Sequence, residues 1–127
     1  MFKDTKAFSG FSVDNLDAAK KFYNETLGIM ITEEHGMFTL HLGTGGEVLV
    51  YSKEAGHQPA TYTVLNFPVE NIDAATDELA AKGIKFEIYD GMHQDDKGIS
   101  RGKAANMGPD IAWFKDPAGN ILSVLQN

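Results

Sequence analysis

Hydrophobic and polar positions alternate along several short stretches of the chain, whereas two longer stretches follow the spacing of a helix. Apolar residues recur at helical spacing after Asn15, and they do so again after Asn71. Each helical stretch ends at a glycine, Gly28 or Gly83, which suits a left-handed helix C-terminus. The alternating stretches are typical of strands, in which successive side chains point to opposite faces. They cover residues 8–13, 29–33, 37–42, 47–52, 62–67, 85–89, 111–115 and 121–125.

The chain contains an internal repeat. VDNLDAA at residues 13–19 recurs as VENIDAA at residues 69–75, with five identical positions and two conservative changes. Asn15 and Asn71 occupy the position of a helix N-cap, where a side-chain oxygen accepts from a free backbone amide. Each half reads β-α-β-β-β, and neither half is long enough to bury a sizeable core alone. The repeat therefore predicts one α+β domain, residues 1–127, built from two similar modules at 1–57 and 58–127.

The composition is that of an ordinary globular protein, with 43% hydrophobic and 23% charged residues among 127. The formal net charge is −7, and lysine and arginine are scattered, so no basic stripe is available to neutralise phosphates. The chain has no cysteine, which excludes disulfides, thiolate catalysis and sulfur-based zinc sites. No stretch approaches the roughly 20 apolar residues of a membrane span, and no signal peptide is apparent. We therefore expect a cytoplasmic protein that binds neither nucleic acid nor membranes.

One polar residue interrupts an apolar face of the last predicted strand. The segment Asp116-Pro117-Ala118-Gly119-Asn120 has the composition of a compact turn between two strands. After this turn, Ile121, Ser123 and Leu125 share one face of the strand. The small hydroxyl of Ser123 on an otherwise apolar face needs an explanation.

Together these features resemble the vicinal oxygen chelate superfamily, whose members include glyoxalase I, bleomycin-resistance proteins, fosfomycin-resistance enzymes and extradiol dioxygenases. The resemblance rests on the opening pattern VxN[LI]DAAxxFY…LG and the closing pattern FxDPxGN, and it covers roughly residues 7–125. It implies two βαβββ modules whose sheets form an open, cupped barrel with the helices outside. It also implies a ligand in the cup and, in many members, a homodimer.

Enzymes of this superfamily bind a divalent metal through the first and last strand of each module. Mapped by the motifs, these positions fall at Phe8, Val50, Val64 and Ser123. None of these side chains is an ordinary ligand for a catalytic divalent ion, and a shift of one residue brings in no His, Asp or Glu. We therefore expect no metal cofactor and no catalytic residues. Ser123 stands where a metalloenzyme of the superfamily carries its closing carboxylate.

Other polar groups carry weaker signals. His35 and His57 lie beside glycines in predicted turns, His41 lies in a strand, and His93 lies in a polar loop. The stretch 90–109 is longer than a typical connection, so it is either a binding loop or an ordinary surface loop. Its arginine, Arg101, has the geometry to hold a carboxylate or phosphate.

We expect a metal-independent protein that binds an apolar or aromatic small molecule in the cup. The expected lining residues are Phe8, Ser12, Val50, Tyr62, Val64, Asn66, Arg101, Trp113 and Ser123. One alternative is a metal-dependent lyase, isomerase or dioxygenase of the same superfamily with ligands such as His41, Glu47 or His93. The other is a structural or protein-interaction module.

Overall fold

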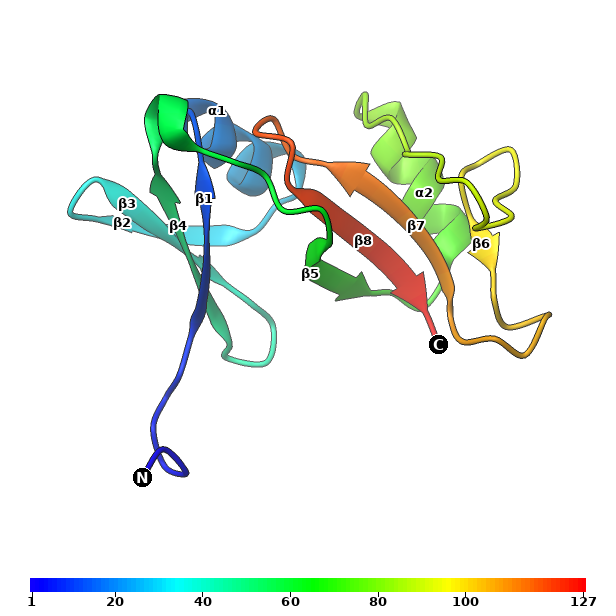
Figure 1. Cartoon of the computed structure of the whole chain (residues 1–127), viewed down its shortest axis with the longest axis horizontal. Coiled ribbons are helices and arrows are strands. Elements are labelled where there is room, and N and C mark those ends of the chain that lie inside the picture. The colour runs from blue at the N-terminus through cyan, green and yellow to red at the C-terminus, as the bar shows by residue number, and fades with distance from the viewer. The chain divides into compact units, whose positions relative to one another are not determined.

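A computed structural model describes all residues of the chain, 1–127, and divides them into two compact units, Met1–Pro59 and Ala60–Asn127 (Figure 1). Each unit contains a four-stranded sheet and a helix in the order βαβββ. The predicted α+β class and the two similar modules are confirmed. Neither helix combines the length and apolar character that crossing a membrane requires.

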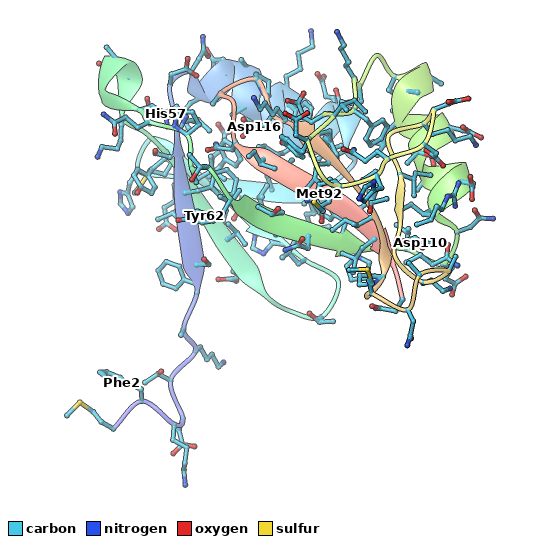
Figure 2. The ribbon with its side chains drawn as sticks, turned by 45° about the vertical axis from the view of Figure 1, so that its right-hand side comes forward. Phe2, His57, Tyr62, Met92, Asp110 and Asp116 are labelled. Carbon is cyan, nitrogen blue, oxygen red and sulfur yellow. The ribbon has the colours of Figure 1, made fainter.

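The first unit forms a sheet with the strand order β1-β4-β3-β2, in which β1 and β4 are parallel and the other pairs antiparallel. Its elements are β1 (Ser9–Val13), α1 (Leu16–Lys20), β2 (Met30–Glu34), β3 (Met37–His41) and β4 (Glu47–Ser52). The helix begins as predicted, since the Asn15 side chain accepts a hydrogen bond from the Ala18 amide at 3.0 Å. In Figure 2 the chain before β1 extends away from this sheet and carries Phe2 near its far end.

The helix of the first unit changes its winding halfway. After α1 the chain continues as a π-helical stretch, η1 (Lys21–Thr26). The adjacent residues Phe22 and Tyr23 are both buried there, and their rings meet edge to face at 5.1 Å. The Tyr23 ring also lies 5.8 Å from Phe11 and 6.5 Å from Phe38, so the helix packs on the face of the sheet that carries these two side chains.

The second unit repeats this plan with the strand order β5-β8-β7-β6, in which β5 and β8 are parallel. Its elements are β5 (Thr63–Pro68), α2 (Ile72–Ala81), β6 (Ser100–Arg101), β7 (Asp110–Lys115) and β8 (Ile121–Gln126). The Asn71 side chain caps α2 by accepting from the Ala74 amide at 3.0 Å. Figure 1 shows α2 along one face of this sheet, where Ile72, Phe114 and Leu122 form a buried core.

The strand predicted at residues 85–89 does not form, because only Phe86 makes a bridge, to Phe114. The edge strand of the sheet is β6. The side chain of Gln94 takes the place of the missing sheet partner, because it accepts from the Tyr89 amide at 2.8 Å and donates to the carbonyls of Glu87 and Gly98, each at 2.7 Å. A side chain thus satisfies backbone groups that a ladder would otherwise pair.

The predicted turn between the last two strands forms as expected. One carboxylate oxygen of the buried Asp116 accepts from the amides of Ala118 and Asn120, each at 2.9 Å, and the other accepts from the Asn120 side chain at 3.0 Å. Gly119 has a φ of 84°, the conformation that glycine adopts without strain. This turn fixes β7 against β8 and therefore sets which residues lie beside Ser123.

Candidate functional site

The second unit presents one face of its sheet that α2 does not cover. The β7–β8 register pairs Ile111 with Leu125, Trp113 with Ser123, and Lys115 with Ile121. These residues alternate with the buried Ala112, Phe114, Leu122 and Val124, which point toward α2. We call the face that carries Trp113 and Ser123 the open face. Its apolar members, Ile111, Trp113, Ile121 and Leu125, are only half-buried.

Ser123 lies at the centre of a row across three strands. Its register partners are Asn66 on β5 and Trp113 on β7. The hydroxyl is fully buried and donates to the Asn66 side-chain oxygen at 2.5 Å. Asn66 is itself exposed, so its amide nitrogen is left as a free donor at the surface of the open face. The serine therefore orients an amide on the face that also carries Trp113, the only tryptophan of the chain, with β8 between the two.

An aromatic pair extends this row toward the edge of the sheet. The Tyr89 and Trp113 rings meet at 5.6 Å with an interplanar angle of 67°. Close by, Lys115 and Glu87 form an ion pair at 3.4 Å. Burial raises the pKa of the Tyr89 phenol above its ordinary value, and the negative charge of Glu87 adds to this shift. Tyr89 was not among the predicted site residues, although the alternation of residues 85–89 carried a signal for its strand-like position.

A register irregularity corrects the prediction for β5. Strict alternation would place Tyr62, Val64 and Asn66 on one face, but the pairing with β8 shifts between Thr63 and Leu65. Thr63 therefore pairs with Ile121 on the open face, and Val64 becomes the extra residue of a bulge. Tyr62 precedes β5 and is 70% exposed (labelled in Figure 2). Of these three predicted lining residues, only Asn66 is a register partner of Ser123.

The first unit also has a sheet face without a helix. Gly10 and Ser12 on β1 pair in register with Leu49 and Tyr51 on β4, and a side chain at Gly10 would meet both of the latter. Phe8 directly precedes β1, two residues before Gly10, and its side chain is 63% exposed. The Ser12 hydroxyl and His57 Nδ1 are 2.7 Å apart, which ties the segment after the 3-10 helix η2 (Glu54–Gly56) to this face.

Val50 does not lie where the sequence predicted. It is fully buried and pairs in register with Phe11 and Phe38, so it belongs to the helix-covered core of the first unit. Its neighbours Leu49 and Tyr51 take its place on the uncovered face. The motif spacing identified the correct strand. It placed the side chain on the uncovered face one residue away from those that lie there.

Arg101 was predicted to line the ligand site, but its guanidinium binds carboxylates of its own unit instead. Its guanidinium donates to both oxygens of Asp73 at 2.8 and 3.0 Å, and its Nε donates to Asp95 at 3.0 Å. Lys97 adds ion pairs to Asp73 at 3.4 Å and to Asp77 at 3.0 Å. Arg101 pairs in register with Asp110. Asp110 lies on the same face of β7 as Phe114, the face that α2 covers. Arg101 therefore links the long loop, residues 90–109, to α2 on the side of the sheet that the helix covers.

The sequence as a whole matches one family model. The model of the Glyoxalase/Bleomycin resistance protein/Dioxygenase superfamily matches residues 8–124. The chain belongs to this superfamily. The predicted resemblance is thereby confirmed.

Solved structures of this superfamily fold are similar over nearly the whole chain. A glyoxalase family protein from Enterococcus faecalis is 24% identical with a TM-score of 0.70, covering 98% of this chain and 99% of that one. TnmS3, an antibiotic binding protein from Streptomyces sp. CB03234, is 20% identical with a TM-score of 0.65 and 97% coverage of both chains. Oxidase ChaP-H2 is 18% identical with a TM-score of 0.67, covering 95% and 93%. A search of curated proteins found no match.

The histidines do not assemble a metal centre of the kind that superfamily enzymes use. His41 contacts Thr32 at 2.8 Å and Glu47 at 3.7 Å, whereas His35 and His93 are exposed residues with positive φ. No group of three or more His, Cys, Asp or Glu side chains in the chain is placed to hold a metal ion. At the mapped ligand positions the side chains of Phe8, Val64 and Ser123 offer no imidazole or carboxylate.

Proposed function

We propose that this protein binds a small apolar or aromatic molecule on the open face of its second unit, without a metal. The observation that carries the proposal is the row Asn66–Ser123–Trp113. It combines a half-buried indole, a buried hydroxyl and an oriented amide donor on one face. Ligand sites typically have apolar and aromatic walls with a few fixed polar groups, and this row has that composition.

The relatives support binding as a function of this fold, since one of them is named an antibiotic binding protein. Another is named an oxidase, so the fold alone does not select between binding and catalysis. The choice rests on donor chemistry. Neither Ser123 nor Val64 supplies a ligand that catalytic divalent ions prefer, and the polar groups beside Trp113 are suited to neutral hydrogen bonds. The homodimer and the cytoplasmic location stay predictions from the resemblance and the composition.

A binding experiment with a planar aromatic probe tests the proposal. We expect 2-acetylnaphthalene to shift the indole N–H signal of Trp113, which is the only indole in the chain, in an NMR titration. Trp113→Leu should weaken binding by about 3- to 10-fold, because an aromatic contact contributes roughly 0.5–1.5 kcal/mol beyond area burial. Ligand-observed NMR gives the dissociation constant for both proteins.

A matched control removes apolar surface elsewhere in the same unit. Ile88 is 68% exposed and lines a surface cavity of about 460 Å³ beside α2, so Ile88→Ala should leave binding unchanged. Equal affinities for wild type and Trp113→Leu would refute the placement of the site. Loss of binding after treatment with a chelator would refute its independence of metal.

A further inference from the structure

One buried polar atom in the chain has no hydrogen-bond partner within the protein. The hydroxyl of Tyr89 is the only buried side-chain nitrogen or oxygen left unsatisfied. The ring that carries it packs against Trp113. A buried polar group without a partner costs roughly 1–3 kcal/mol, so such groups are rare unless they serve another purpose.

Folding does not explain this hydroxyl. The position of Tyr89 is set by its backbone amide, which donates to Gln94 at 2.8 Å, and by the edge contact of its ring with Trp113. A phenylalanine would keep both interactions and would leave no polar atom unsatisfied. The hydroxyl is therefore a donor for which the protein itself supplies no partner.

The surroundings define which partner fits. Burial holds the pKa of Tyr89 above its ordinary value, so at neutral pH the phenol is protonated and can donate. The charges that act on it, Glu87 and Lys115, are paired with each other. No free cation therefore favours a carboxylate or phosphate at this point. A neutral acceptor on a flat ring system satisfies both the hydroxyl and the indole.

We propose that the Tyr89 hydroxyl donates a hydrogen bond to the ligand and that the ligand class is a neutral aromatic carbonyl compound. This inference rests on the proposed function, because it names the chemistry of a molecule bound at the same open face. Trp113 contacts the rings, and Tyr89 selects those that carry a carbonyl oxygen.

Two probes of nearly the same shape test the selection. In 2-acetylnaphthalene a carbonyl oxygen stands where 2-isopropenylnaphthalene has a methylene group. We expect the wild-type protein to bind the ketone about 2- to 10-fold more tightly than the alkene, which is the effect of one net hydrogen bond. In Tyr89→Phe this preference should disappear, while the affinity for the alkene stays unchanged. Ligand-observed NMR measures all four dissociation constants.

The stability of the free variant separates a ligand contact from a structural role. Because the hydroxyl has no partner, Tyr89→Phe should unfold at the same or a higher temperature than the wild type. A lower unfolding temperature together with equal losses for both probes would show a structural role and overturn the inference. An unchanged preference in the variant would overturn it while leaving the proposed function intact. Failure of the wild type to bind either probe would overturn both.

Discussion

Replacing Ser123 by alanine removes the one interaction that orients Asn66. The hydroxyl is fully buried, and its hydrogen bond to the Asn66 oxygen is the contact that the substitution deletes. A net hydrogen bond contributes about 0.5–1.5 kcal/mol. Asn66 is exposed, so water can replace the lost donor, and no unsatisfied group remains to add a penalty. We therefore expect the free energy of unfolding to fall by about 0.5–1 kcal/mol, at the lower end of that range.

The same substitution should also weaken ligand binding. Without Ser123 the Asn66 amide rotates freely, and holding it in place on binding then costs entropy that the wild type has already lost. Urea unfolding followed by the fluorescence of Trp113 reports the stability of the second unit, which contains the only tryptophan. Ligand-observed NMR with 2-acetylnaphthalene reports the affinity.

Ser100 offers a matched control. Its hydroxyl donates to the Met92 carbonyl at 2.7 Å in the same unit, but it is not part of the row across Ser123. Ser100→Ala should therefore lose a similar, small amount of stability and bind the probe like the wild type. If Ser123→Ala and Ser100→Ala bind the probe equally well, the orienting role of Ser123 is wrong.

Two further predictions concern the way α2 and the long loop are held. The hydrogen bond from Arg101 lowers the pKa of Asp73 from 3.8 to about 2, so its contribution to stability is present above the unfolded value and is lost as the pH falls from about 4 toward 2. Acid titration of unfolding should show this loss in the wild type but not in Asp73→Asn, and parallel curves for the two proteins would contradict it. Removing the helix cap in Asn71→Ala should cost about 0.5–2 kcal/mol in urea unfolding, whereas Asn71→Ser should cost far less. Equal stabilities of the alanine and serine variants would show that the cap does not contribute.

The repeat and the turn motifs could be predicted from the sequence because local chemistry determines them. Asn15 and Asn71 cap their helices whatever surrounds them, and Asp116 organises its turn through bonds to residues at most four positions away. Such short-range interactions leave a pattern in consecutive residues. The class, the module order and the superfamily followed from these patterns.

The phase of the side chains could not be predicted in the same way. Val50 turned out to face the core because β4 pairs with β1 and β3 in a register that only the folded sheet sets. The bulge at Val64 shifts every position before it by one residue, and nothing in the sequence of β5 marks it. Arg101 finds its partners on α2 and in its own loop, 28 and 6 residues away, so its neighbours cannot be read from spacing.

The same distinction explains why the sequence could predict the position of Ser123 but not the residues that lie beside it. Its position after the turn was secure, whereas its partners Asn66 and Trp113 come from two other strands and meet it only through the register. A carboxylate at this buried position would need a cation or several donors to offset its desolvation. The flanking amide and indole supply too few. The hydroxyl needs one acceptor, and Asn66 provides it at 2.5 Å. The row is therefore consistent with a neutral site, and this is the physical reason for preferring neutral ligands over metal chemistry at the open face.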